Sequence, residues 1–286
     1  MSWETLITIH ILFSTAYALS FRRLAQRLPH VPHLATALMY LLTIWPIGIG
    51  YALYAGDINF NLSMGIWIML LVAGLLFAGF NFLGWRANTH IDAAQFAVIS
   101  NLQGVFTVIL SGIFLGERMT HIQLLGVIII VSAASMVAVK GFTKDTFHIG
   151  RWSWVAIVSS LFAGAAISSE KFLVGEMSLP TYFILGWGLQ TIWMTVLVGK
   201  EWKHLSSLTK VDYRDIIWQG LLRTGAGFAI IHAFLLADSG LLSSIRSYKT
   251  VLIFLCALIF LGEKEHFWRK AAGSVLATVG LLLIID

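Results

Sequence analysis

Three basic side chains lie inside apolar stretches that are long enough to cross a membrane: Arg223, Arg246 and Lys249. A charge near the centre of a bilayer costs about 2.5–3.5 kcal/mol on insertion scales, so each of these side chains should face a wet cavity or a partner. Because residues three and four apart share one helix face, Arg246, Lys249 and Thr250 should point the same way. The positive excess predicts a cavity that receives an anion, either a carboxylate or a phosphate. The alternative is a structural pairing with backbone carbonyls or with Glu170.

Two histidines inside apolar stretches, His10 and His232, are candidates for carrying a coupling proton. An imidazole titrates near neutral pH, which suits it to that role. His10 begins a polar stripe with Ser14 and Tyr17, and a stripe at this helical spacing should face the interior of a bundle. Tyr17 is therefore a candidate substrate-binding residue. The alternative for both histidines is a packing role.

Five neutral residues complete the candidate binding site. Three of them, at positions 100 to 103, match in the internal repeat described below the segment that carries two of the three cations. They predict a hydrogen-bonding wall opposite a charged one. For Ser100 and Gln103 the alternative is hydrogen bonds between neighbouring helices. The other two, three residues apart on one helix, either line a pocket or pack toward lipid. The five are Ser100, Asn101, Gln103, Trp187 and Gln190.

The composition places all these residues in an all-α membrane protein. The 286 residues are 58% hydrophobic and 12% charged, with a mean hydropathy of +0.84, whereas soluble domains are about 25% charged. A membrane-spanning helix needs about 20 mainly apolar residues, and the alternating pattern of a barrel strand is absent. Pro46 should kink the second span. Ten segments qualify as spans: residues 4–21, 34–54, 65–85, 93–115, 119–139, 152–169, 180–199, 216–237, 239–261 and 267–285.

An internal repeat divides the chain into two halves. Residues 74–117 align without gaps on residues 220–263, so that Gly79 matches Gly225 and both segments end in Leu-Gly-Glu. Each half holds five helices, and this odd number inverts the second half in the membrane. Two inverted repeats around a cavity are typical of secondary transporters, because the halves can exchange conformations and alternate access. The predicted organisation is a first repeat at 1–140, a cytoplasmic linker at 141–151 and a second, inverted repeat at 152–286.

The basic residues between the spans predict the orientation, because cytoplasmic loops are enriched in lysine and arginine. One side of the predicted membrane holds only Arg118 and Lys171. The other side should be cytoplasmic, which gives a multi-pass protein of the cell (inner) membrane with both termini non-cytoplasmic. The residues of this richer side are Arg22, Arg23, Arg27, Arg86, Lys140, Lys144, Arg151, Lys200, Lys203, Lys210, Arg214, Lys264, Arg269 and Lys270.

Several classes of protein lack their signals in this sequence. There is no Gly-x-x-x-x-Gly-Lys-Ser/Thr phosphate loop, no nucleophile elbow and no clustered set of cysteines and histidines. We therefore expect no enzymatic activity, no cofactor and no metal. The basic residues form no soluble patch, so nucleic acid is not an expected partner. The expected partners are a small-molecule substrate and the lipid bilayer, for a monomer or a homodimer.

The two Leu-Gly-Glu sequences also carry a family resemblance. Phe114-Leu115-Gly116-Glu117 with Gly126, and Phe260-Leu261-Gly262-Glu263 with Gly273, resemble the EamA-type ten-helix transporters of the drug/metabolite transporter superfamily. The resemblance implies that helices 1–4 and 6–9 form a basket around a central cavity, with helices 5 and 10 peripheral. It also implies movement of small metabolites such as amino acids, nucleosides or drugs, often outward. In placement, the basic residues on the ninth helix are similar to those of family members that handle sugar phosphates.

The predicted function is a secondary transporter, either an exporter or an exchanger, of a small polar metabolite that bears a carboxylate or a phosphate, such as an amino acid or an organic anion. One alternative is an exporter of cationic or multiple drugs, which requires an accessible acid deep in the membrane. A second is a membrane enzyme that acts on a lipid phosphate, which requires clustered carboxylates or histidines at one interface. A third is a scaffold that transports nothing, which gives no reason for three buried cations.

Overall fold

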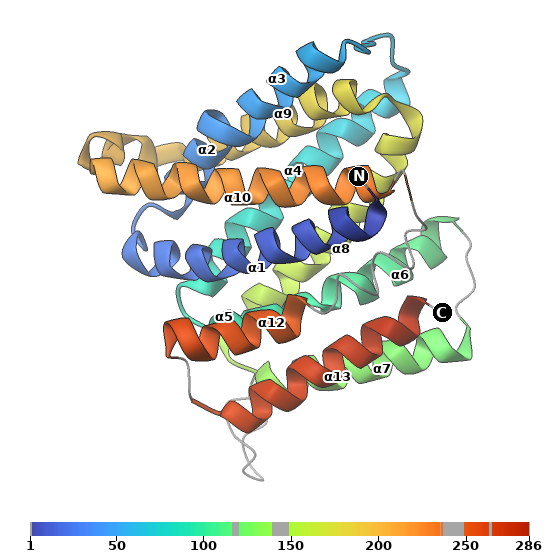
Figure 1. The fold of residues 1–286 in the computed structure, drawn as a ribbon, viewed down its shortest axis with the longest axis vertical. Helices are drawn as coiled ribbons and strands as arrows, with labels where there is room; N and C mark the ends of the chain where they lie inside the picture. The colour runs from blue at the N-terminus through green and yellow to red at the C-terminus, as the bar shows by residue number, and fades with distance from the viewer. Residues whose placement is uncertain are drawn as a thin grey trace.

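A computed structural model describes residues 2–115, 120–138, 149–234, 236, 249–262 and 265–285, and it shows a bundle of helices (Figure 1). The fold class predicted from the sequence is confirmed. In chain order the elements are α1 (Trp3–Arg27), α2 (Pro32–Met39), the π-helical segment η1 (Tyr40–Ile44), α3 (Trp45–Ala55), α4 (Met64–Asn88), α5 (Ala93–Ser100), α6 (Leu102–Leu115), α7 (His121–Ala138), α8 (Arg151–Glu176), α9 (Leu179–Val198), the 3-10 segment η2 (Gly199–Ser207), α10 (Lys210–Phe234), α12 (Lys249–Cys256), the π-helical segment η3 (Ala257–Leu261) and α13 (Phe267–Ile285).

These elements correspond to the ten predicted spans. The second span consists of α2, η1 and α3, the fourth of α5 and α6, and the ninth is described from Lys249 through η3. Among the described residues, five helices are long and apolar enough to cross a membrane. Three helices continue past their predicted ends into charged residues, to Arg27, to Glu176 and back to Lys210. A helix satisfies its own backbone hydrogen bonds outside the hydrocarbon as well as inside it, so falling hydropathy does not end it.

Both termini lie at the same end of the bundle (Figure 1), as an even number of crossings requires. At the opposite end α1, α4 and α7 finish and α8, α10 and α13 begin. We call this opposite end the basic end, because it contains the lysine- and arginine-rich connections of the sequence.

Two of the spans are irregular in ways that the sequence partly predicts. The second span is π-helical at Tyr40–Ile44, directly before Pro46 near the start of α3, where proline cannot supply an amide hydrogen for the helical ladder. The ninth span is π-helical at its end and stops at Gly262, which has a φ of +67°. This left-handed conformation favours glycine as a helix cap. The matching Gly116 lies outside the described residues.

The two halves are interlocked rather than separate. α1 packs on α10, and α4 packs on α8, so each crossing joins one half to the other. At the first crossing Gly225 lies against the ring of Phe13, and at the second Gly79 lies against the ring of Phe162. These two glycines, Gly79 and Gly225, are also the ones that the sequence repeat aligns with each other. The boundaries of the repeats at residues 140 and 152 stay a prediction, because these contacts join the halves and do not delimit them.

Matching hydrogen bonds accompany the two crossings. The Nδ1 atom of His10 lies 2.9 Å from the carbonyl oxygen of Ala226. The hydroxyl of Ser159 donates to the carbonyl oxygen of Phe80 at 3.0 Å. Both donors sit three residues before the phenylalanine that meets the glycine of their crossing. Each helix pair therefore combines a close glycine contact with a polar contact about one helical turn away.

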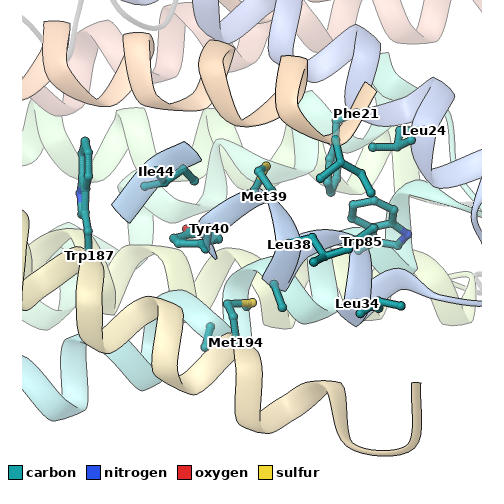
Figure 2. Close-up of a cluster of buried hydrophobic side chains, with 14 of the residues drawn as sticks. Phe21, Leu24, Leu34, Leu38, Met39, Tyr40, Ile44, Trp85, Trp187 and Met194 are labelled. Atoms are coloured by element: carbon teal, nitrogen blue, oxygen red, sulfur yellow. The ribbon is translucent and has the colours of Figure 1, made fainter. Parts of the chain in front are cut away.

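The largest cluster of buried apolar side chains lies among α1, α2, η1, α4, α9 and α10 (Figure 2). Phe21 meets the ring of Trp85 edge-on, with 4.8 Å between ring centroids. Tyr40, on η1, is 1% exposed and brings a hydroxyl group into this apolar cluster. On the far side of the bundle, α7 and α13 pack together (Figure 1), which agrees with a peripheral position for the fifth and tenth spans.

Close packing of α10 on η1 gives a first prediction. A Cβ atom at Gly220 would lie 1.7 Å from Oγ1 and 2.8 Å from Cβ of Thr43, so Gly220→Ala should destabilise the protein by about 1–3 kcal/mol through overpacking. Gly50→Ala on α3 is the matched control, because no atom lies within 4 Å of its new Cβ. Thermal unfolding of the purified variants in detergent measures both. If Gly220→Ala unfolds no earlier than Gly50→Ala, the contact is wrong.

Candidate functional site

Arg223 lies on α10 in a cage of aromatic side chains contributed by other spans. Its guanidinium carbon is 5.5 Å from the ring centroid of Tyr17 on α1 and 5.9 Å from that of Phe80 on α4. It also donates a hydrogen bond to the hydroxyl of Tyr40 on η1. Aromatic faces attract a cation electrostatically, and more strongly where water is excluded. Arg223 is half-buried, so part of its surface stays accessible within the cage.

A second layer of hydrogen bonds holds the hydroxyl of Tyr40. The side-chain amide of Asn81 donates to this oxygen at 3.2 Å and to the carbonyl oxygen of Phe77 at 2.7 Å. Tyr40 and Asn81 are 1% and 4% exposed. A buried polar network that is fully hydrogen-bonded keeps one geometry. The position of the Arg223 guanidinium is therefore set by side chains of α1, η1 and α4.

An acidic residue belongs to the same cluster. The hydroxyl of Tyr182, on α9, donates to Oε1 of Glu170, on α8, at 2.5 Å, and Tyr182 is 1% exposed. Glu170 lies within electrostatic range of both Tyr182 and Arg223. The interior therefore holds one acidic and one basic group, supplied by different helices. We call the set Tyr17, Tyr40, Asn81, Phe80, Glu170, Tyr182 and Arg223 the central cluster.

Sequence reasoning missed five members of the central cluster as site residues, Phe80 among them. Tyr40 and Tyr182 lie in apolar stretches, where an aromatic residue does not indicate a binding site. Asn81 belongs to none of the spacing patterns that we used to choose site residues. Glu170 was weighed only as a structural partner, because the sixth span was predicted to end at residue 169. The helix continues to Glu176, so Glu170 lies inside it. A helix boundary drawn at the start of the next helix, which Ser178 caps, would have included this residue.

The polar residues of the fourth and ninth spans meet in the bundle interior. The Asn101 amide donates to Oγ1 of Thr250 at 3.1 Å, and this hydroxyl donates back to Oδ1 at 3.2 Å. The two residues are 2% and 1% exposed. Asn101 also interrupts the fourth span between α5 and α6. The Asn101 side chain therefore joins the fourth span to the ninth, and its contact with a solute stays a prediction.

The neighbours of this pair have different surroundings. Lys249 is the first described residue of α12 and is half-buried, whereas Arg246 lies outside the described residues. Gln103 is half-buried on α6. The hydroxyl of Ser100 is buried and has no hydrogen-bond partner within the described part of the chain. The structure thus places Ser100, Gln103 and Lys249 near the Asn101–Thr250 pair, and their contact with a solute stays a prediction.

The two candidate proton carriers share one hydrogen-bonding pattern. In His10 and in His232, Nδ1 lies 2.9 Å and 2.8 Å from a backbone carbonyl oxygen. Because a carbonyl only accepts, Nδ1 must carry the hydrogen in both rings. Nε2 then faces a hydroxyl, that of Ser14 at 3.3 Å or that of Tyr51 at 3.1 Å. This pattern gives both histidines a structural role, and their role in proton coupling stays a prediction.

Trp187 and Gln190 lie on α9 in the interior of the bundle, since each is 5% exposed. Of the two readings of this pair, packing toward lipid does not fit that burial. The Trp187 ring meets Phe183 at 4.5 Å and Phe228 at 5.1 Å between centroids, both edge-on. Figure 2 places Trp187 beyond Ile44 and Tyr40 in the same cluster of side chains.

A cavity of about 340 Å³ lies at the basic end rather than at the central cluster. An ionic network borders it: Asp92, which precedes α5, contacts Lys270 of α13 and lies 3.9 Å from Arg22 of α1. Arg22 also donates to the carbonyl oxygen of Asn88. The side chains of Arg22 and Lys270 are 8% and 5% exposed. The residues lining the cavity are His90, Ile91, Asp92, Gln95, Val137, Gly150, Trp152, Ser153, Glu265, His266, Arg269 and Lys270.

A bundle of apolar spans with charged and hydrogen-bonded side chains between its helices defines a polytopic membrane protein of the transporter class. Residues 1–139 match the model of the EamA-like transporter family. The chain is 24% identical over 205 residues to a probable terminal-alkyne amino-acid exporter of Streptantibioticus cattleyicolor, an alignment that covers 71% of this chain and 67% of that protein. The first half of the chain therefore has the sequence of an EamA-like transporter of the drug/metabolite transporter superfamily, and both matches are to transporters rather than to enzymes.

Two further comparisons agree with this assignment. The pseudopaline exporter CntI of Pseudomonas aeruginosa is 29% identical over 98 residues, which cover 34% of each chain. A solved crystal structure matches 98% of this chain and 94% of its own length with a TM-score of 0.63 and 16% identity. At that identity the match shows the fold alone.

The Asn101–Thr250 pair gives a second prediction. Thr250→Val keeps the shape of the side chain but leaves the buried Asn101 amide without its partner, which should cost about 1–3 kcal/mol of stability. Thr195→Val is the control, because that hydroxyl bonds only to a carbonyl of its own helix, α9. Equal thermal unfolding of the two variants would contradict a tie between the fourth and ninth spans.

The ionic network gives a third prediction. Asp92→Asn leaves two buried cations without their carboxylate, so we expect a loss of about 3 kcal/mol in stability. Adding Lys270→Met to this variant should recover part of the loss, because the buried ammonium group that lost its carboxylate is then removed. Asp57→Asn, at an exposed position, is the control. Thermal unfolding that is no lower in Asp92→Asn than in Asp57→Asn would refute the network.

Proposed function

We propose that this protein moves a small polar metabolite bearing a carboxylate or a phosphate across the membrane by alternating access, as an exporter or an exchanger. The observation that carries the proposal is Arg223, a permanently charged side chain inside the bundle. It is held by aromatic rings and by the hydroxyl of Tyr40. The exporters that resemble this chain support outward movement, and one of them is named for an amino acid, a solute that carries a carboxylate.

The proposed binding site combines the central cluster with the fourth and ninth spans. Arg223 is the main anion-binding residue, and its planar fork of N–H groups matches a carboxylate or a phosphate. Lys249 and Arg246 add positive charge from the ninth span. Six further residues complete the proposed site and give it shape and hydrogen bonds: Tyr17, Ser100, Asn101, Gln103, Trp187 and Gln190.

The orientation is also part of the proposal. Excess lysine and arginine marks the cytoplasmic side of a membrane protein, so we place the basic end in the cytoplasm and both termini outside it. With this placement the 340 Å³ cavity and the Asp92 network face the cytoplasm. An exporter loads its solute from that side.

Glu170 supports a second candidate function, the export of cationic compounds. A drug exporter needs an acid within the bundle, and Glu170 lies there with the hydroxyl of Tyr182. Arg223 belongs to the same cluster and repels a purely cationic solute. The mixed charge of the cluster therefore favours a solute with an anionic group over a simple cation.

A fourth prediction tests the anion site. The purified protein in proteoliposomes is assayed by counterflow against the twenty L-amino acids, short-chain carboxylates and small phosphate esters. Arg223→Gln removes the charge-assisted hydrogen bonds to the anion, worth about 1.5–3 kcal/mol, so uptake at subsaturating solute should fall about 10- to 100-fold. Lys249→Ala should likewise abolish saturable uptake.

Arg214→Gln is the control for Arg223→Gln, because Arg214 lies on the same helix with its side chain 73% exposed. It should transport within about twofold of the unchanged protein, as surface substitutions have small effects. Size-exclusion profiles show whether each variant is folded. Folded Arg223→Gln and Lys249→Ala variants that transport at the rate of Arg214→Gln would remove the binding role of both cations.

A further inference from the structure

The central cluster holds two groups of opposite charge on neighbouring parts of the interior. Arg223 comes from α10 and Glu170 from α8, and the two are within electrostatic range of each other. Both residues are half-buried, so each keeps some accessible surface although it belongs to a helix within the bundle. An ionisable side chain in a membrane-spanning helix is costly, so two that interact with each other are a candidate functional site.

Separate hydroxyl groups hold the two charges. Tyr182 on α9 donates to Glu170 at 2.5 Å, while the hydroxyl of Tyr40 accepts a hydrogen bond from Arg223. Asn81 in turn fixes Tyr40. The acid and the base are therefore positioned by different helices, α9 on one side and η1 with α4 on the other. This arrangement presents a negative and a positive end to a single solute.

We infer that Glu170 is a specificity-determining residue, which selects solutes that carry an ammonium group next to their carboxylate. The inference rests on the proposed function, in which Arg223 binds the carboxylate. A zwitterion of the α-amino-acid type matches both ends at once, with its ammonium group toward Glu170 and its carboxylate toward Arg223. A simple carboxylate offers Glu170 no ammonium group, and a simple amine offers Arg223 no carboxylate.

The plain alternative is that Glu170 only neutralises Arg223. The two roles differ in what they do to selectivity. A neutralising residue stabilises the site whichever solute is bound, so its removal lowers the transport of every solute by a similar factor. A residue that binds the ammonium group changes the ratio of the transport rates of solutes with and without that group. The ratio, rather than the absolute rate, is therefore the measurement that decides between them.

The experiment uses the full chain in proteoliposomes and three matched sets of probes. The twenty L-amino acids form the first set, the same molecules without the α-amino group the second, and the corresponding amines without the carboxylate the third. We expect at least one amino acid to drive counterflow, and its desamino acid and its amine to drive it about 10- to 100-fold less well.

Glu170→Gln removes the charge and keeps the shape of the side chain. In this variant we expect the preference for the amino acid over its desamino acid to fall about 10-fold or more, while counterflow of the desamino acid is unchanged or improved. Tyr182→Phe keeps the carboxylate and removes its hydrogen bond, so the preference should fall less. Glu176→Gln is the matched control, because Glu176 is an exposed glutamate at the end of the same helix. It should keep the preference of the unchanged protein.

The outcomes separate the two proposals. If carboxylates without an amino group are transported as well as amino acids, the anion site stands and the role of Glu170 fails. The same holds if Glu170→Gln lowers transport of both probes by one factor. If no probe of the first two sets is transported but a small phosphate ester is, the proposed function stands and the inference fails. If none of these solutes is transported, both fail. Where Glu170→Gln does not fold, Tyr182→Phe decides, since an unchanged preference in that folded variant overturns the inference.

Discussion

The structure depends on one constraint: a charged group within a membrane-spanning bundle must interact with other polar or aromatic groups, because lipid offers no hydrogen bonds. Arg223 is stabilised by two aromatic faces, by the hydroxyl of Tyr40 and by the charge of Glu170. These partners come from α1, α4, η1 and α8, so the interior position of one guanidinium fixes how four other segments approach α10. The central cluster is in this sense an organising element of the fold as well as the proposed site.

The same constraint operates away from the centre and there produces structure alone. At the basic end Asp92 joins Arg22 and Lys270, which are almost completely buried. In the interior Asn101 and Thr250 satisfy each other, and His10 uses a ring nitrogen to reach a backbone carbonyl across a helix crossing. Burial of a polar group is therefore not by itself a sign of binding. What distinguishes the central cluster is that opposite charges there keep accessible surface.

The sequence alone predicts the helical class and the ten spans, because long apolar stretches leave few other structures in lipid. It also predicts that Arg223 and Tyr17 face the interior, and the structure brings them together. It does not predict Tyr40, Tyr182 or Glu170 as site residues. Tyr40 and Tyr182 are aromatic residues within apolar stretches, where hydropathy does not distinguish them from packing residues. Glu170 lies just past the helix end that hydropathy predicted, which was too early in the chain. Partners that meet across different helices leave no spacing pattern along the chain, so only coordinates reveal them.

The crossings of α1 with α10 and of α4 with α8 bear on how the protein assembles. Phe13 is inserted early during synthesis, but Gly225, against which it packs, belongs to a helix that begins at Lys210. Until that helix arrives, α1 lacks the helix on which most of its packing surface lies. Final locking is therefore a late event that involves both halves together. A truncated product that contains only the first five spans lacks α10 and α8, the main packing partners of α1 and α4.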